Sequence, residues 1–189
     1  MSVGWAVLAV VCSYGLGTIP GSAIVARRHG VDLRTTGDGN PGAWNALEQL
    51  GWRRAWPAFL LDGLKGLAAA LLGWAAVWSV DAPGWLPWAC VGAAMLGHAF
   101  PPWAPSRGGK AVMTFAGGAI GLVPAAALPL AVVAGVLAAL GRGRLGARLA
   151  VFGFPVLQAA FTPLVQVGWT GVLMTLIGLL FLLRRRDRV

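Results

Sequence analysis

Residues 30–45 read GVDLRTTGDGNPGAWN, and this polar segment divides a chain that is otherwise mostly apolar. It contains four glycines, two asparagines and one arginine. Glycines at this density allow sharp turns that point several backbone N–H groups at one place. An arginine beside them can clamp an oxyanion through two parallel hydrogen bonds. The segment is therefore a candidate anion cradle, and the alternative is an ordinary solvated loop between two apolar helices.

The composition around this segment is that of a membrane protein. Of 189 residues, 58% are hydrophobic and 11% are charged, whereas a soluble domain carries about 25% charged residues. The net charge of +9 comes from basic residues beside apolar runs, which indicates topology signals and contacts with anionic lipids rather than nucleic acid. Cys12 and Cys90 both lie in apolar runs and lack the spacing of a disulfide framework or a metal site.

The apolar runs predict an all-α integral membrane protein, with one domain over residues 1–189 that forms a compact bundle of seven transmembrane helices. The predicted spans are 3–26 with a kink at Pro20, then 55–80, 84–100, 111–122, 125–140, 149–162 and 163–183. The first run lacks the basic start and cleavage site of a signal peptide, so it is predicted to be retained. Residues 141–148 are predicted to form a basic loop. A count of five spans, with one or both long runs unsplit or re-entrant, is the alternative.

Basic residues alternate between the connections of the seven-span arrangement. The connections near residues 81, 123 and 163 contain no lysine or arginine, and the others do. By the positive-inside rule, the N-terminus is predicted to be outside and the C-terminus cytoplasmic. The predicted location is the plasma membrane, with the candidate site on the cytoplasmic side.

Four polar side chains of the predicted helices gather on that side. Thr18 lies near the inner end of the first helix, and His98 ends the third. Asp62 and Lys65 are three residues apart on the second helix and so share one face. Ionisable residues at membrane depth usually face the bundle interior and mark a functional path. The alternatives are a structural ion pair for Asp62 and Lys65, and an interfacial histidine for His98.

Several motifs of soluble enzymes are excluded. Residues 37–42 and 141–146 match G-x-G-x-x-G, but neither segment follows a strand, which excludes a dinucleotide-binding fold. The chain has no G-x-S-x-G elbow, no His-x4-Asp dyad and no cluster of metal ligands. Residues 105–110, PSRGGK, are more informative, because a Gly-Gly pair beside lysine at the start of a helix is a plausible anion site.

These residues resemble the PlsY family of integral-membrane acyl-phosphate:glycerol-3-phosphate acyltransferases. The family's first block, G-S-x-P and then G-x-D-[LV]-R-x-x-G-S-G-N-x-G-A-T-N-x-x-R-x-x-G, corresponds to residues 17–20 and 30–51. Its D-x-x-K-G corresponds to residues 62–66. Its G-H-x-F-P and K-G-G-K-G-V-A-T correspond to residues 97–101 and 107–114. The resemblance covers residues 15–115, without a gap inside any block.

The chain departs from the family pattern at several of these positions. Asp38 stands where the family has serine, Trp44 where it has threonine, Glu48 where it has arginine, and Ala111 where it has glycine. The two carboxylates are predicted to fall where an anion would bind. There they would oppose a phosphate unless a cation offsets them.

The resemblance implies acyl transfer from an acyl phosphate to the 1-hydroxyl of glycerol 3-phosphate, giving lysophosphatidic acid and phosphate in phospholipid biosynthesis. The implied partners are these substrates and membrane lipids, with no cofactor and no nucleic acid. The predicted catalytic residues are Lys110, Arg34 and His98. The predicted substrate-binding residues are Thr18, Gly37, Asp38, Gly39, Asn40, Gly42, Asn45, Asp62, Lys65, Gly108, Gly109 and Thr114.

Two roles stay open at this point. His98 either donates a hydrogen bond to a phosphate oxygen or assists proton transfer. Asp38 is either offset by Arg34 or Lys110, or points away from the phosphates. A divergent family member that binds an anion or a lipid without this catalysis is the alternative function. An unrelated small transporter is a third, which the lack of a convincing internal repeat disfavours.

Overall fold

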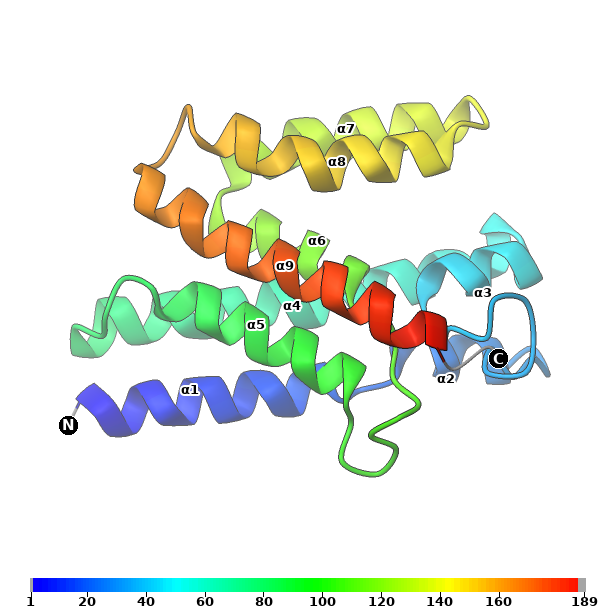
Figure 1. Ribbon diagram of the computed structural model, residues 1–189, viewed down its shortest axis with the longest axis horizontal. Helices are drawn as coiled ribbons and strands as arrows, with labels where there is room; N and C mark the ends of the chain where they lie inside the picture. The colour runs from blue at the N-terminus through cyan, green and yellow to red at the C-terminus, as the bar shows by residue number, and fades with distance from the viewer. Residues whose placement is uncertain (1, 187–189) are drawn as a thin grey trace.

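The computed structural model describes residues 2–186, with side chains from 3 to 184, as a bundle of helices (Figure 1). Nine helices lie in this range: α1 (Ser2–Gly17), α2 (Gly21–Arg27), α3 (Ala43–Leu50), α4 (Trp52–Val80), α5 (Leu86–Ala99), α6 (Val112–Leu122), α7 (Pro124–Ala139), α8 (Gly143–Gln158) and α9 (Leu164–Arg186). Figure 1 shows α1, α4 and α5 running alongside one another, with α7 and α8 paired as a hairpin along one side.

Three helices are long and apolar enough to cross a membrane, judged by length and composition. They are Val3–Arg27, Trp52–Val80 and Leu164–Arg184. The shorter helices α5, α6 and α7 are also apolar. Large apolar side chains such as Val132 and Val156 are exposed on the α7–α8 hairpin, as expected of a surface that faces lipid. The predicted all-α membrane class is confirmed.

Two predicted helix breaks are confirmed. The first apolar run is interrupted at residues 18–20, between α1 and α2, where Pro20 cannot donate a backbone hydrogen bond. The run from 111 to 140 breaks at Val123, and Pro124 is the first residue of α7. Proline fits that first position because its missing N–H would have no helical partner there.

Three predicted boundaries are wrong. The polar stretch before α4 contains a helix, α3, whose Leu47 and Leu50 pack against the buried alanines of α4. Helix α4 begins at Trp52 rather than at residue 55. The predicted basic loop 141–148 is mostly the first turns of α8, which begins at Gly143. Arginine and leucine are good helix formers, so the charge of this stretch does not prevent a helix.

Small residues let the central helices approach closely. A Cβ added at Gly117 would lie 1.9 Å from the carbonyl oxygen of Gly63, so α6 and α4 meet backbone to backbone. Likewise, a Cβ at Gly97 of α5 would lie 2.2 Å from the carbonyl oxygen of Tyr14 of α1. Close packing of this kind is the main source of helix association in lipid. A Cβ at Gly73 of α4 would likewise lie 2.4 Å from Cα of Pro87 of α5, so close contacts join all four helices.

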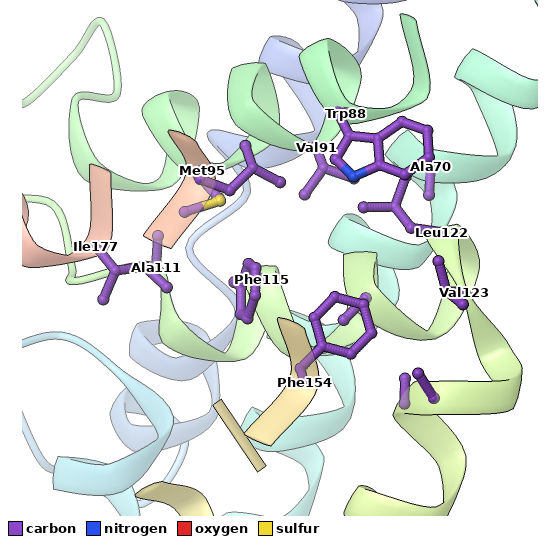
Figure 2. Packing of buried hydrophobic residues seen from close by; sticks show 14 of the residues in the cluster. Ala70, Trp88, Val91, Met95, Ala111, Phe115, Leu122, Val123, Phe154 and Ile177 are labelled. Atoms are coloured by element: carbon purple, nitrogen blue, oxygen red, sulfur yellow. The ribbon is translucent and has the colours of Figure 1, made fainter. Parts of the chain in front are cut away.

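The apolar core lies between α5, α6, α8 and α9. Phe115 and Phe154 meet edge to face, with ring centroids 6.0 Å apart, and Met95 and Val91 pack beside them (Figure 2). This core lies beside the polar end of the bundle, because Phe115 follows directly on the segment 107–114. It therefore supports the helix that begins after Lys110.

Candidate active site

Asn45, in the first turn of α3, organises the polar loop. Its buried side-chain amide nitrogen lies 2.9 Å from the carbonyl oxygens of Leu33 and Thr36 and 3.1 Å from that of Asn40. The amide has two N–H groups, so three carbonyls share them. Gly37 has φ +59°, and a Cβ there would lie 2.1 Å from Oδ1 of Asn45. The loop is therefore closed around Asn45 and leaves no room for a side chain at residue 37.

A polar pocket opens where the α1–α2 break, the polar loop and the α5–α6 connection meet. Five predicted site residues line it: Thr18, Arg34, His98, Gly108 and Gly109. The Nε atom of Arg34 lies 3.4 Å from the carbonyl oxygen of Arg107, which ties the two loops together. The sequence blocks therefore converge in space, and they form one cationic pocket lined by glycine backbone.

The glycine pair 108–109 is packed directly against the end of α5. A Cβ at Gly108 would lie 2.0 Å from the carbonyl oxygen of Ala99, and a Cβ at Gly109 would lie 2.2 Å from Nε2 of His98. The N–H of Gly109 donates to the carbonyl oxygen of His98 at 3.2 Å. The absence of side chains at both positions therefore lets the imidazole reach the pocket.

Lys110 is paired with the carboxylate that departs from the family pattern. Its Nζ lies 3.1 Å from Oδ2 of Asp38 and 4.9 Å from the centroid of the Phe181 ring. Oδ1 of Asp38 accepts from the N–H of Asn40 at 3.0 Å. Lys110 thus provides the offsetting cation that one of the two interpretations of Asp38 requires. Neither Asp38 nor Lys110 lines the pocket itself, although Lys110 follows Gly109 directly.

Asp62 and Lys65 form a buried network behind the pocket. Nζ of Lys65 lies 3.0 Å from Oδ1 of Asp62, and both side chains are almost fully buried. Ser22 of α2 donates to Oδ2 of Asp62, and Nζ of Lys65 also contacts the carbonyl oxygen of Ile19 and Nδ1 of His98. The predicted shared face is confirmed. Neither side chain lines the pocket, and Lys65 contacts the pocket lining at His98 and Ile19.

The remaining predicted residues do not line the pocket in the described structure. Thr114 is buried between α4 and α6, where its carbonyl oxygen meets Gly66. Five other predicted residues belong to the polar loop but do not line the pocket: Gly37, Gly39, Asn40, Gly42 and Asn45. Binding of substrate by these residues stays a prediction.

Glu48 pairs with an arginine of α8 instead of lying at the predicted anion site. Its Oε1 accepts from Nη2 of Arg144 at 2.6 Å and from Nε1 of Trp44 at 2.8 Å. These two hydrogen bonds, the stronger from Arg144, lower the pKa of Glu48 below its ordinary value. Glu48 does not line the pocket. The expectation that it places a carboxylate at the anion site is therefore wrong, because the start of α8 brings a cation to it.

Sequence reasoning missed three residues at the site. Arg107 and Trp103 line the pocket. Arg184 of α9 donates to the carbonyl oxygens of Ser106, Ala99 and Pro105 and lies 5.4 Å from the Phe100 ring centroid. Arg107 occupies the first lysine position of the family's K-G-G-K-G, which was a usable signal. Nothing local to Arg184 indicated its contact with a loop 78 residues away.

The fold and the pocket together define a helical integral-membrane protein with a cationic, glycine-lined pocket at one end of its bundle. The chain belongs to the glycerol-3-phosphate acyltransferase family, whose model matches residues 7–189. It is 44% identical over 116 residues to a glycerol-3-phosphate acyltransferase of Sinorhizobium medicae, which covers 61% of this chain and 54% of that protein. It is 36% identical over 171 residues to one of Gloeobacter violaceus, with coverages of 89% and 80%.

Solved structures agree with this assignment. The fold is similar to the crystal structure of PlsY (YgiH), an integral membrane glycerol 3-phosphate acyltransferase, in its glycerol 3-phosphate form. The TM-score is 0.76 at 32% identity, over 96% of this chain and 88% of that chain. The lysophosphatidic acid form of PlsY matches with the same TM-score. The chain spans only about half to two thirds of the length of several curated relatives that it matches.

Proposed function

We propose that this protein transfers an acyl group from an acyl phosphate to the 1-hydroxyl of glycerol 3-phosphate, giving lysophosphatidic acid and phosphate. The hydroxyl oxygen bonds to the acyl carbon, the bond from that carbon to the phosphate oxygen breaks, and the hydroxyl proton ends on the released phosphate. One observation carries the proposal. In a member of this family, Arg34, Arg107, His98 and the backbone of Gly108 and Gly109 line a single pocket.

The chemistry suits this set of residues. An acyl phosphate is a mixed anhydride with a good leaving group, so positioning and charge stabilisation carry the catalysis. Arg34 and Lys110 neutralise phosphate charge, and the glycines allow close approach of backbone N–H groups to the oxygens. Asp38 orients Lys110 toward the phosphate, since an ammonium has three N–H groups and can contact the carboxylate and the phosphate together.

An apolar groove between α1 and α4 provides a place for the acyl chain. Cys12 and Leu16 line it from α1, and Ala68 and Leu71 line it from α4. Ile19 lines both this groove and the polar pocket, so the two are adjacent. Ala68→Trp should therefore raise KM for palmitoyl phosphate but not for butyryl phosphate. An equal rise for both donors would place the chain elsewhere.

The topology we propose has seven spans, an external N-terminus and a cytoplasmic site in the plasma membrane. Figure 1 supports it, because the α2–α3 region, the α5–α6 and α7–α8 connections and the end of α9 lie toward one end of the bundle. The base-free connections α4–α5, α6–α7 and α8–α9 lie toward the other. Positive charge is enriched in cytoplasmic connections.

Cysteine labelling in intact cells tests this topology, in a background with Cys12 and Cys90 replaced by alanine. Cysteine at Ser79 or Asp81 should react with an impermeant maleimide from outside. Cysteine at Ser106 or Arg144 should react only after the membrane is opened. External labelling at Ser106 would contradict the proposed orientation.

The activity is tested with purified protein, acyl phosphate and glycerol 3-phosphate, following the release of phosphate. A parallel reaction with acyl-CoA tests the choice of donor. Product should form only when both substrates are present, and an Arg34→Met variant is the inactive control. Phosphate release without glycerol 3-phosphate would indicate hydrolysis instead of acyl transfer.

A second candidate function is a divergent member that binds an anion or lipid without transferring an acyl group. The ion pair between Asp38 and Lys110 favours it, because a carboxylate already pairs with the cation that directly follows the glycine pair. In this case, glycerol 3-phosphate would bind in a calorimetric titration while no phosphate is released from an acyl phosphate.

A further inference from the structure

Lys65 makes three polar contacts inside the bundle. Its Nζ lies 3.1 Å from the carbonyl oxygen of Ile19 and within hydrogen-bond distance of Nδ1 of His98, and it forms an ion pair with Oδ1 of Asp62 at 3.0 Å. A lysine ammonium has three N–H groups and no acceptor. It can therefore donate to Ile19 and to His98, provided that Nδ1 of His98 carries no proton.

The carboxylate of Asp62 favours the charged form of Lys65. Its side chain is 4% exposed and that of Asp62 is 1% exposed, so a neutral amine would leave a carboxylate buried with only the hydroxyl of Ser22 to stabilise it. Removing one partner of a buried pair in this way is strongly destabilising. The ammonium and the carboxylate instead balance each other. Their common neighbour, His98, then serves as a neutral acceptor on its Nδ1 side.

A neutral imidazole that accepts at Nδ1 carries its proton on Nε2. Nε2 is the atom nearest Gly109, where a Cβ would lie 2.2 Å away, and both residues line the pocket. The proton is thus on the side of the ring that faces the glycine pair. A group in this state can donate a hydrogen bond but cannot remove a proton from a hydroxyl.

We propose that Lys65, held by Asp62 and Ser22, is a positioning residue that fixes His98 in the Nε2–H tautomer, so that His98 donates a hydrogen bond to an anionic substrate oxygen. This inference rests on the proposed function for the identity of that oxygen, which belongs to a phosphate or to the acyl carbonyl. No proton transfer passes through His98. The network also explains why a charged pair lies inside the bundle without touching the pocket.

The tautomer is measured by nitrogen-15 NMR on the full chain labelled at histidine, in lipid nanodiscs. The sequence contains only His29 and His98, so His29→Gln leaves a single signal source. The expected spectrum shows a protonated Nε2 and an unprotonated Nδ1 in the absence of substrate. A protonated Nδ1, with Lys65 as a neutral acceptor, would overturn the proposal. This result is independent of whether the protein transfers acyl groups.

Lys65→Met should convert the His98 signal to a mixture of tautomers. Thr170→Val is a matched control, because it breaks a buried hydrogen-bond chain with Trp88 and Gln158, away from the pocket. It should reduce stability and leave the His98 spectrum unchanged. If Thr170→Val shifts the tautomer as Lys65→Met does, general loosening is the cause and the proposal fails. The wild-type spectrum decides the question even if Lys65→Met does not fold.

Kinetics separate a donor from a base. The amide nitrogen of glutamine can take the place of Nε2–H, so His98→Gln should keep turnover within about tenfold of wild type, whereas His98→Ala should lose about 100-fold. If His98 is a base, both variants should lose turnover equally. Equal losses of turnover in His98→Gln and His98→Ala would contradict the proposal. A wild-type protein without activity would contradict the proposed function but not the tautomer of His98.

Discussion

Asp38 and Glu48 lie ten residues apart, and both are carboxylates at positions where the family has none, yet the structure uses them in different ways. Asp38 pairs with Lys110, beside the glycine pair of the pocket, and only 12% of the Lys110 side chain is exposed. Glu48 pairs with Arg144, whose side chain is 74% exposed, at the start of the α7–α8 hairpin. The effect of a new charge within a motif therefore depends on which side chain the fold places next to it.

The exposure of the two cations sets the energies that these pairs involve. An exposed ion pair contributes about 0–1 kcal/mol, because water screens it and two long side chains must be held in place. A cation with little exposure is screened less. The Glu48 contact thus joins two elements weakly, whereas the Asp38 contact holds a lysine side chain that is little exposed. Four predictions test this difference.

The largest effect is expected at Lys110. Lys110→Met removes the cation that directly follows the glycine pair and should lower turnover by about 100-fold or more, since a charge that stabilises the reacting oxygens has no substitute. Arg144→Met, the matched change in the other pair, should stay within about twofold. Both are measured by phosphate release. Similar losses of turnover in Lys110→Met and Arg144→Met would show that the two ion pairs do not differ in their effect on function.

The next effect is expected at the glycines beside each pair. Gly109→Ala places a Cβ 2.2 Å from Nε2 of His98, so the imidazole must move, and turnover should fall at least about tenfold. In Gly143→Ala the new Cβ would lie 3.3 Å from the Trp44 ring, which can give way. Turnover of that variant should match wild type. An active Gly109→Ala enzyme would show that His98 is not held where the structure has it.

A smaller change is expected for Asp38→Ser, which restores the family residue. We expect turnover to fall by about tenfold, because Lys110 loses the carboxylate that orients it, and a hydrogen bond to a charged group is worth about 1.5–3 kcal/mol. Asp38→Asn is the control, since it keeps an acceptor for the N–H of Asn40 without the charge. A rise in turnover for Asp38→Ser alone would mean that the carboxylate merely repels substrate.

The smallest effect is expected for Glu48→Gln, which should lower stability by less than about 1 kcal/mol. The folded-state pKa of Glu48 lies below the ordinary value of 4.5. Its stabilisation is therefore present above that pH and is lost as pH falls through the lowered pKa. Thermal unfolding should separate wild type from Glu48→Gln at pH 7 and bring them together in acid. A difference that persists in acid would exclude the ion pair as its cause.

The helical class and much of the pocket followed from the sequence because the signals were local. Asp62 and Lys65 meet because three residues make nearly one helical turn. The breaks at Pro20 and Pro124 follow from a missing backbone donor. The convergence of residues 34, 98 and 109 followed from the family resemblance, since periodicity gives no information on which loops meet.

The parts that could not be predicted depend on distant or subtle contacts. The partners Glu48 and Arg144 are 96 residues apart, and no sequence period connects them. The short helix α3 could not be predicted within a polar segment. A helix of this length depends on packing against its neighbours, and its apolar residues pack against α4. A role for Asn45 in orienting the polar loop could be predicted, but its three carbonyl partners could not, because each contact requires the closed loop.

Arg184 has a consequence for the order in which the protein is made. The connection between α5 and α6, which carries Gly108 and Gly109, is held at three carbonyl oxygens by a guanidinium from α9. Ribosomes build the chain from its N-terminus, so this connection is synthesised well before the helix that anchors it. During insertion into the bilayer, a chain that ends before α9 has every pocket-lining residue but lacks this anchor. The contacts of Arg184 with this connection therefore form only after the final helix has been made, and a chain that ends early lacks them.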